Sequence, residues 1–465
     1  MKKRILSLLL VLLMVVSLVP TAALAEDDVV AYKVTGGNIY FNKSTGEIID
    51  CDAGVTEANI PSEIDGVKVT GIWGFAHRAN LESVKIPNSV KNIYDCTFED
   101  CENLANVTIS NGVISIGASA FSLCKSLRSI TIPDSVTSIG SYAFESTGLT
   151  SVMIPESVTS IGYIAFASCE SLTDIKVADE NTAYCSVNGV LFNKDITEII
   201  QYPAGKADSY YAIPESVRSI VWSAFSGCER LANIEIPDGV TDIGNSAFSN
   251  CKNLKNITIP DSVTSIEISA FLNCESLTSV AISNKVTSIG WCTFSGCTAL
   301  TSVTIPNSVT HIDSHAFGGC TSLKSIKIPD SVTSIGMGAF SDCQSLTNIY
   351  YTGTEEQWNA INILGGNETL LNATIHYNYH EHVAELRNAV EPTCTEAGYT
   401  GDEVCTVCGE VISQGETIPA TGHHFKGNTC PDCGETRSTS DTVRAWFQES
   451  FNNMKNFFDK IFGRN

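Results

Sequence analysis

Two Cys-x-x-Cys-Gly motifs in the C-terminal part of the chain have the residue types and spacing of a metal site. They span residues 405–409 and 430–434, and 21 residues separate Cys408 from Cys430. Paired thiolates at this spacing bind one tetrahedral ion, and the glycine allows the backbone to turn around the sulfur atoms. Because four sulfurs leave no open coordination position, the sequence predicts a structural zinc ion bound by Cys405, Cys408, Cys430 and Cys433.

Other assignments of these residues remain open from the sequence. A competing ligand set consists of Cys394, Cys405, Cys408 and His423. Disulfide bonds between the cysteines are a second alternative. A redox-active Cys-x-x-Cys pair is the least favoured, because no strand–helix–strand pattern surrounds either motif.

The sequence contains no complete catalytic motif. His311 and His315 have the i, i+4 spacing of a helical zinc site, but no glutamate follows the first histidine. A glycine-rich phosphate loop and a Gly-x-Ser-x-Gly nucleophile elbow are also missing. We therefore expect a protein without enzymatic activity.

Half of the 18 cysteines occupy the same position of an internal repeat, which we call the slot. This repeat determines the secondary structure of most of the chain. The repeat is anchored on the residue that follows each Ile-x-Ile-like pattern. Nine of the eleven steps between anchors are 23 residues, one is 22, and one is 36, which inserts 13 residues between Ala178 and Pro214. The anchors are Pro87, Ser110, Pro133, Pro155, Ala178, Pro214, Pro237, Pro260, Ser283, Pro306, Pro329 and Thr352.

Each repeat predicts a short strand, a turn and a short helical segment. The Ile-x-Ile alternation predicts a strand with one buried face, and the following proline ends it. Val-x-x-Ile-Gly then turns the chain, and Ala-Phe-x-x-Cys-x-x-Leu fits a short helical segment. One repeat cannot bury its apolar face alone, whereas stacked repeats share a continuous core. The predicted fold class is an α/β solenoid of about 13 coils with short parallel strands, followed by a small Cys-rich ribbon and a C-terminal amphipathic helix.

The consensus Leu-x-x-Ile-x-Ile-Pro-x-Ser-Val-x-x-Ile-Gly-x-x-Ala-Phe-x-x-Cys-x-x recurs through residues 81–350 and resembles the BspA-like leucine-rich repeat family. The resemblance implies an N-terminal cap at 26–60, a repeat array at 61–352 with an irregular hairpin insertion at about 178–213, and a C-terminal cap at 353–380. It also implies an exported protein of the bacterial surface that takes part in adhesion and protein binding. The segment from Pro392 to His423 resembles a small Cys-rich repeat of exported bacterial proteins, and we expect a zinc-ribbon-like module at residues 381–436.

The cysteines of the repeat slot are expected to be structural. Thr147 fills the slot in the short repeat, so the position accepts a small, weakly polar side chain. Neighbouring slots lie about one strand spacing apart with parallel side chains, which favours stacked free thiols over disulfides. The slot cysteines are Cys101, Cys124, Cys169, Cys228, Cys251, Cys274, Cys297, Cys320 and Cys343; Cys51, Cys96, Cys185 and Cys292 lie outside the slot and have no assigned role.

A candidate contact strip follows from the strand pattern. The residue between the two buried positions of each Ile-x-Ile strand faces outward, so that stacking aligns these residues in one row. A partner that lies along this row would bind through many weak contacts. The strip consists of Lys85, Thr108, Thr131, Met153, Lys176, Glu235, Thr258, Thr304, Lys327 and Tyr350.

The two ends of the chain predict export and attachment. Residues 1–25 have a basic start, an apolar run at 5–19 and an Ala-x-Ala site, which predicts a signal peptide cleaved after Ala25. Apolar residues recur at three- and four-residue spacing between 441 and 462, so we expect an amphipathic helix within 437–465. This helix could pack on the protein, contact a membrane or the cell envelope, or pair with itself.

The net charge disfavours one class of partner. The net charge of −23 disfavours nucleic acid as a partner, because phosphates would be repelled. Together with the predicted signal peptide, the family resemblance implies a secreted or cell-surface protein that binds extracellular proteins or glycans through its repeat face. The alternative is a structural component of the envelope or matrix, held through the Cys-rich module and the tail helix. An enzyme that uses the array as a scaffold ranks third.

Overall fold

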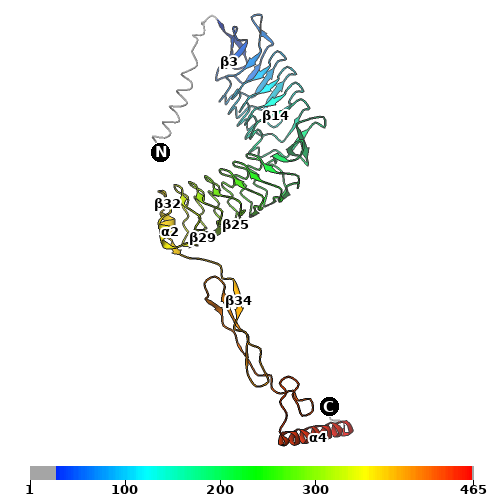
Figure 1. Ribbon diagram of the computed structural model, residues 1–465. Coiled ribbons are helices and arrows are strands. Elements are labelled where there is room, and N and C mark those ends of the chain that lie inside the picture. The colour runs from blue at the N-terminus through cyan, green and yellow to red at the C-terminus, as the bar shows by residue number, and fades with distance from the viewer. Residues whose placement is uncertain (1–27, 463–465) are drawn as a thin grey trace. The chain divides into compact units, whose positions relative to one another are not determined.

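The computed structural model describes residues 28–462 (Figure 1). The predicted signal peptide, residues 1–25, lies outside the described residues. The chain divides into two compact units, Met1–Asn378 and Tyr379–Asn465. Each unit is described separately below.

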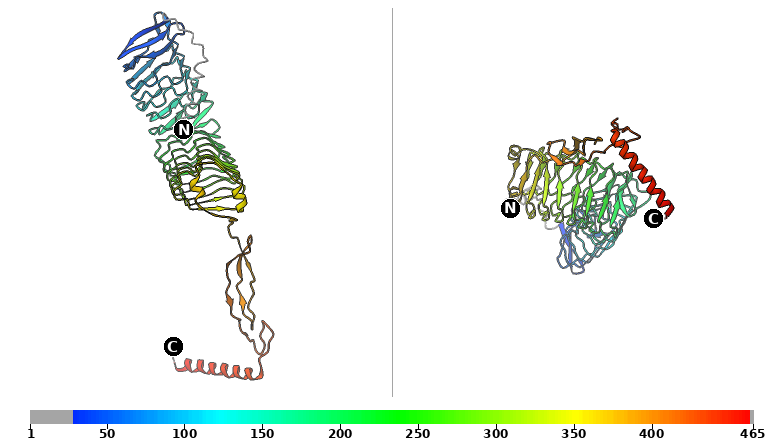
Figure 2. Two further views of the ribbon diagram at one scale, coloured as in Figure 1. Left: turned by 90° about the vertical axis from the view of Figure 1, so that its left-hand side faces the viewer. Right: turned by 90° about the horizontal axis from the view of Figure 1, so that it is seen from below.

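The first unit is a solenoid of about 14 turns, which confirms the predicted fold class and is close to the 13 coils expected (Figures 1 and 2). Most turns add one strand to each of two faces, but the turn that contains Thr131 has no strand on the first face. The first face carries the Ile-x-Ile strands β4 (Glu57–Asn59), β8 (Ser83–Ile86), β10 (Asn106–Ile109), β13 (Ser151–Ile154), β15 (Asp174–Val177), β19 (Tyr210–Ala212), β21 (Asn233–Glu235), β23 (Asn256–Thr258), β25 (Ser279–Ala281), β27 (Ser302–Thr304), β29 (Ser325–Ile328), β31 (Asn348–Tyr351) and β33 (Thr374–His376).

The second face carries shorter strands formed by the Val-x-x-Ile segment, which sequence reasoning treated as a turn. They are β3 (Glu47–Cys51), β7 (Gly71–Ile72), β9 (Asn92–Ile93), β11 (Ser115–Ile116), β12 (Ser138–Ile139), β14 (Ser160–Ile161), β18 (Glu198–Gln201), β20 (Ser219–Ile220), β22 (Asp242–Ile243), β24 (Ser265–Ile266), β26 (Ser288–Ile289), β28 (His311–Ile312), β30 (Ser334–Ile335) and β32 (Asn362–Ile363). Pairing from turn to turn is parallel and in register, as in Ile243 opposite Ile266.

The segment after each second-face strand differs from the short helical turn expected. In the coil that contains Phe121, the amide of Ser122 donates to the Ser119 carbonyl and that of Cys124 to the Phe121 carbonyl, which makes successive three-residue turns. The amides of Phe121 and Leu123 donate instead to Ala143 and Glu145 in the next coil. Ser119 and Leu123 have positive φ values of 52° and 62°. A helix is excluded because alternate amides bond between coils.

The core is a stack of identical side chains. Phenylalanine rings of successive coils lie with centroids 5.0 to 5.5 Å apart and are mostly parallel, as in Phe121 and Phe144 at 5.4 Å and 1°. This spacing is close to the strand separation of about 4.8 Å, so one ring fits each coil. The core forms two clusters, one from Ile39 to Leu191 and one from Val190 to Leu370.

The division between the clusters coincides with the 13-residue insertion. A hairpin of β16 (Tyr184–Val187) and β17 (Val190–Asn193) pairs antiparallel with β18. The second-face sheet that begins at β1 ends at β14, and a new sheet begins with β16, β17 and β18. The parallel ladder of the second face is therefore interrupted between β14 and β18.

Short elements close the two ends of the array. β1 (Val29–Val34), β2 (Gly37–Asn42) and β3 form an antiparallel meander, followed by the small hairpin of β5 (Glu63–Ile64) and β6 (Val67–Lys68). At the other end, α2 (Glu355–Asn359) begins with a capping box in which Thr354 and Gln357 satisfy each other's backbone amides. A second short helix, α3 (Glu368–Leu371), follows.

The second unit is a thin β-structure with one long helix. β34 (Ala384–Arg387), β36 (Asp402–Cys405) and β37 (Val411–Ser413) form an antiparallel sheet, and β35 (Gly398–Tyr399) pairs with β38 (Thr417–Ile418). Helix α4 spans Thr439–Phe462. Among the described residues of this unit, the buried hydrophobic side chains are Val404 and three cysteines, Cys394, Cys405 and Cys430.

Candidate functional site

The predicted contact strip faces outward on the first face. Parallel register places Thr108 beside Lys85, Met153 beside Lys176, and Lys327 between Thr304 and Tyr350. Eight members of the strip are exposed, and Lys327 and Tyr350 are partly buried. The strip is mostly threonine and lysine, so it presents a polar surface with little aromatic area.

A second row of exposed side chains was missed by the sequence reasoning. Its members lie one to three residues after second-face strands. We call it the aromatic row, because all its members except Ile268 and Met337 are aromatic. Its members are 38% to 57% exposed. They are Trp73, Tyr94, Tyr142, Tyr163, Trp222, Ile268, Trp291 and Met337. The row includes three of the five tryptophans of the chain, and this enrichment in the Ile-Gly-x region of the repeat was the available signal.

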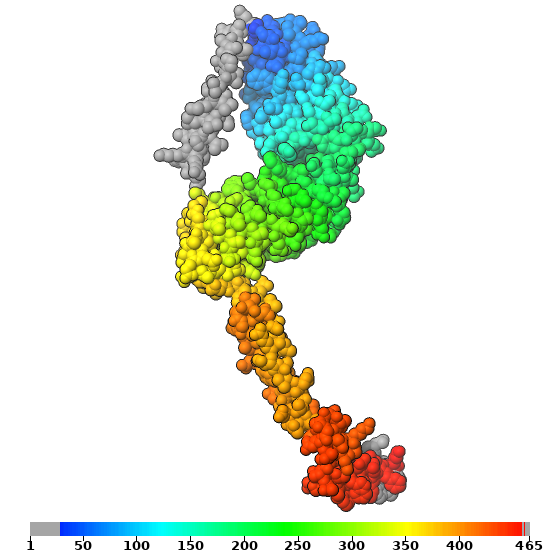
Figure 3. Space-filling view, viewed as in Figure 1, coloured from blue at the N-terminus to red at the C-terminus, as the bar shows by residue number. Residues whose placement is uncertain are grey.

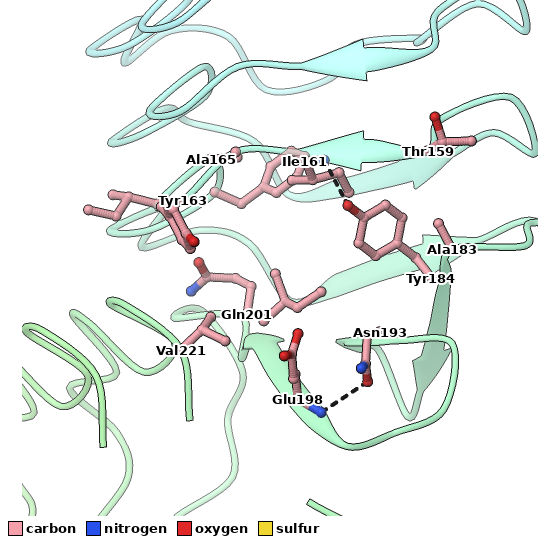
Figure 4. Close-up of a pocket in the computed structure, with 14 residues that line it drawn as sticks. Thr159, Ile161, Tyr163, Ala165, Ala183, Tyr184, Asn193, Glu198, Gln201 and Val221 are labelled. Atoms are coloured by element: carbon pink, nitrogen blue, oxygen red, sulfur yellow. Dashed lines mark hydrogen bonds between the residues drawn. The ribbon is translucent and has the colours of Figure 1, made fainter. Parts of the chain in front are cut away.

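The row is densest where the insertion interrupts the second face. The rings of Tyr163 and Trp222 stack with centroids 4.8 Å apart and planes at 29°. Beside them a pocket of about 400 Å³ lies between the coil of β14 and the inserted hairpin. Figure 4 shows Tyr163, Gln201 and Val221 on one side of this pocket and Tyr184 on the other.

Tyr184 compensates for the missing strand pairing. Its hydroxyl accepts a hydrogen bond of 2.8 Å from the amide of Ile161 (Figure 4). Ile161 belongs to β14, the last strand of its sheet, which pairs with β12 on one side only. The side chain therefore keeps the sheet edge satisfied while leaving the pocket open.

Acidic side chains surround this region. Glu198 lines the pocket and also a neighbouring hollow of about 450 Å³, whose other lining residues include Trp222, Asp242 and Glu267. The residues that line these two hollows include no lysine, arginine or histidine. A stacked aromatic pair beside carboxylates suits a partner that presents cationic or hydroxyl groups.

The slot cysteines form an ordered ladder inside the array. Each thiol lies close to an aromatic-residue carbonyl of the preceding coil, as Cys124 Sγ donates to the Phe98 carbonyl at 3.2 Å and Cys251 Sγ to Phe225 at 3.1 Å. Thr147 uses its hydroxyl to donate to the Phe144 carbonyl. Burial raises the pKa of Cys251 to about 12. The structure records all the slot cysteines as free thiols.

The remaining cysteines of the first unit have separate environments. Cys51 is buried, and its backbone carbonyl accepts a hydrogen bond of 3.2 Å from Arg78 Nε. Cys185 donates to the Asn193 carbonyl across the inserted hairpin. Cys96 is exposed, and Cys292 is buried near the surface. Burial raises the pKa of all four thiols.

The structure does not bring the four cysteines of the two Cys-x-x-Cys motifs together. Each motif instead joins other residues in a separate group: His380, His382, Cys405 and Cys408 form group 1, and Cys394, His423, Cys430 and Cys433 form group 2. The ligand atoms within each group lie within 4.8 Å of one another. The four cysteines of the predicted set are therefore divided between the two groups, and the competing set Cys394, Cys405, Cys408 and His423 is divided in the same way.

Group 1 lies at the start of the second unit. Cys408 Sγ is 3.7 Å from His382 Nδ1, and the Val407 amide donates to Cys405 Sγ at 3.4 Å. A hydrogen bond from the Cys408 amide is the largest cause that lowers the pKa of Cys405 to about 5, with a further contribution from His382. A thiolate at Cys405 is therefore favoured at neutral pH.

Group 2 has a similar arrangement with a third sulfur. Cys394 Sγ and Cys430 Sγ are 3.7 Å apart, and Cys433 Sγ is 3.3 Å from His423 Nδ1. Burial opposes ionisation of Cys430, but hydrogen bonds from His423 and from the Cys433 amide lower its pKa to about 6. Burial raises the pKa of Cys394 to about 11.

The His311 and His315 pair does not form a metal group among the described residues. His311 lies exposed in β28 and its Nδ1 is 2.6 Å from the Thr310 hydroxyl. His315 lies in the following turn with φ 56°.

Helix α4 exposes its apolar side chains. Val443, Trp446, Phe447, Phe451, Met454 and Phe457 are 53% to 64% exposed. Among them, the rings of Trp446 and Phe447 contact each other, with centroids 5.3 Å apart. No helix among the described residues combines the length and hydropathy needed to cross a membrane.

Comparison with known families gives a match to the BspA type leucine rich repeat region, in six copies at residues 71–202, 208–320 and 287–362. The chain belongs to the BspA-type leucine-rich repeat family. This confirms the resemblance seen in the sequence. No curated protein matches the chain.

Comparison with solved structures also gives matches to bacterial proteins, including leucine-rich repeat proteins. A leucine-rich repeat protein from Eubacterium ventriosum is 25% identical, with a TM-score of 0.58, 77% of this chain covered and 98% of the other. A leucine rich cell surface protein from Faecalibacterium prausnitzii is 29% identical, with a TM-score of 0.49 and coverage of 72% and 97%. The pneumococcal vaccine antigen PcpA is 20% identical, with a TM-score of 0.53 and coverage of 76% and 98%, and supports the fold alone.

Proposed function

We propose that this protein is secreted or held at the cell surface, where its repeat array binds an extracellular protein or glycan without catalysis. Membership of a leucine-rich repeat family is consistent with an interaction role. A long array of this kind offers a continuous surface whose neighbouring coils can contact one partner together.

The observation that carries the proposal is the stacked pair of Tyr163 and Trp222 with the adjoining pocket at the insertion, which we call the aromatic site. Tyr163 and Trp222 stay 57% and 41% exposed although their rings together offer a large apolar area. Tyrosine and tryptophan dominate binding energy at interfaces, and such energy concentrates in a few residues around a pocket. The pocket beside this pair gives a partner side chain or sugar ring a place to be enclosed.

The polar strip has a supporting role in this proposal. Threonine and lysine side chains contribute little binding energy each, but their alignment from coil to coil extends the contact. We infer that the aromatic site anchors the partner, and that the strip adds weaker contacts where the partner reaches the first face.

A second candidate function is attachment to the envelope through the second unit. Its support is the exposed apolar face of α4, because a helix of this kind gains free energy by burying that face in a membrane interface or against another protein. This function is compatible with partner binding by the array.

The test is saturable binding of residues 26–465 to a panel of extracellular-matrix proteins, mucins and glycans, in parallel with a chain that ends at Asn378. The proposal predicts equal affinity for the two chains, because the array carries the site. Circular dichroism and thermal unfolding of the shorter chain serve as the folding control. Binding by the full chain alone would place the function in the second unit, and binding by neither would contradict the proposal.

A further inference from the structure

We propose that the second unit binds two zinc ions at separate sites, one held by His380, His382, Cys405 and Cys408 and the other by Cys394, His423, Cys430 and Cys433. Each site has four protein ligands, which is the closed coordination of a structural zinc ion.

The distances between ligand atoms fit tetrahedral zinc. With Zn–S of about 2.3 Å and Zn–N of about 2.0 Å, a tetrahedron places two sulfurs about 3.8 Å apart and a sulfur and a nitrogen about 3.5 Å apart. The Cys394 and Cys430 sulfurs are 3.7 Å apart. The sulfur–nitrogen distances are 3.7 Å for Cys408 and His382 and 3.3 Å for Cys433 and His423. A disulfide would require about 2.05 Å between sulfurs.

The outer surroundings of the two sites repeat each other. In each site a histidine turns Nδ1 toward a cysteine and Nε2 toward the glutamate that follows the Cys-x-x-Cys-Gly motif. His423 Nε2 lies 3.1 Å from Glu435 and His382 Nε2 lies 3.9 Å from Glu410. A carboxylate on the far nitrogen of a zinc-binding histidine is the usual second contact, because it fixes the ring and strengthens the ligand.

The backbone of both motifs is folded in the same way. The Cys405 amide donates to the Glu410 carbonyl and the Gly409 amide to the Cys405 carbonyl, at 2.8 and 2.9 Å. The corresponding bonds of Cys430 with Glu435 and Gly434 are both 2.9 Å. Gly409 and Gly434 have φ values of 76° and 77°, which side chains rarely adopt. The chain therefore forms two equivalent knuckles, each of which positions its own pair of sulfurs.

The described part of the second unit has almost no apolar core. Val404 is the single buried hydrophobic residue apart from cysteine in the described part of residues 379–465. Small domains without an apolar core fold with the help of a metal ion or of disulfides. The ligands of both sites include buried cysteines that lie beside histidines. Zinc therefore supplies this stability at two points of the second unit.

The test is the zinc content of the full mature chain, residues 26–465, purified under reducing conditions. Elemental mass spectrometry gives the number of zinc ions per chain, and a separate assay counts the free thiols. We expect two zinc ions per chain. Cys408→Ser and Cys433→Ser should each remove one, and Cys96→Ser, which changes an exposed cysteine outside both sites, should retain both.

Cobalt substitution distinguishes the two sites by their number of sulfur ligands. The sulfur-to-cobalt absorption grows with the number of sulfur ligands, so Cys408→Ser should leave the stronger, three-sulfur site and Cys433→Ser the weaker, two-sulfur site. His382→Cys should retain two ions and increase the absorption. One zinc per chain lost equally through either motif would overturn the proposal in favour of a shared four-cysteine site. Absence of zinc with cysteine pairs found oxidised would overturn it in favour of disulfides.

Discussion

The phenylalanine stack allows a quantitative test of how the array is stabilised. Phe271 is fully buried, and its ring lies 5.2 Å from that of Phe248 and 5.4 Å from that of Phe294, with both pairs within 5° of parallel. Phe271→Ala removes one ring from the middle of the stack. Phe340→Ala, at the last ring, removes one stacking contact, with Phe317 at 5.3 Å.

The expected cost follows from the burial and the contacts. Replacing a buried phenylalanine by alanine costs about 3–5 kcal/mol, because the apolar transfer energy is lost and a cavity remains. Each aromatic pair adds about 0.5–1.5 kcal/mol beyond burial. We therefore expect Phe271→Ala near the upper end of the range, and Phe340→Ala about 1 kcal/mol less destabilising.

The insertion determines which part of the array responds. Because the core divides into two clusters near residue 190, the effect of Phe271→Ala should be confined to the second cluster, residues 190–370. Hydrogen exchange measured by mass spectrometry under native conditions reads the free energy of opening for peptides of each cluster separately.

Phe121→Ala is the matched variant in the first cluster, where its ring stacks on Phe98 and Phe144. It should lower protection in residues 39–175 and change the second cluster by less than about 1 kcal/mol. Equal losses in both clusters from either variant would refute the division of the core, and equal costs for Phe271→Ala and Phe340→Ala would refute the contribution of stacking.

Three further predictions concern other parts of the chain. The Cys274 thiol donates to the Phe248 carbonyl. Threonine can replace this hydrogen bond and valine cannot, so urea unfolding should show Cys274→Thr to be about 1 kcal/mol more stable than Cys274→Val. A valine variant of equal or greater stability would show that the thiol acts only as an apolar side chain. Hydrogen bonds from Tyr40 and Asn38 lower the pKa of Asp52, so its contribution to stability is present above the unfolded-state pKa and is lost as the pH falls through the folded-state pKa. Asp52→Asn should therefore flatten the acid side of the stability curve, and an unchanged pH dependence would contradict this role. In α4, Phe447→Ser with Phe451→Ser should weaken sedimentation with lipid vesicles more than tenfold at any fraction of anionic lipid, because apolar area drives this contact; a strong dependence on anionic lipid would indicate charge instead.

The repeat made most of the first unit predictable. Period, buried positions and outward strip all follow from a 23-residue pattern in which Ile, Val, Phe and Cys recur at fixed places. The second-face strands were read as a turn and the segment after them as a helix, because both are too short for periodicity to decide. Cross-coil hydrogen bonds, which no local pattern reveals, make that segment a series of turns.

The candidate sites were predictable only in part. The Cys-x-x-Cys motifs identified metal-binding residue types, but the assignment to two groups depends on how β34, β36 and the following loops bring distant residues together. His380 and His382 were not considered, since they precede their cysteines by more than 20 residues. The aromatic site required the insertion to bring Tyr163 onto Trp222, 59 positions later in the chain. Figure 3 shows the surface from one side of the array, in which the coils pack closely.

The most direct test of the central claim is the affinity of the best ligand from the binding panel for full-length chains that differ at the two surfaces. The double variant Tyr163→Ala with Trp222→Ala removes the aromatic site. The double variant Thr258→Ala with Thr304→Ala is the matched control, because it changes two exposed residues of the strip. We predict that the aromatic pair variant loses at least about thirtyfold in affinity, corresponding to about 2 kcal/mol, while the strip variant changes by less than about fivefold. Unchanged affinity in the aromatic variant, with its fold intact by hydrogen exchange, would contradict the account.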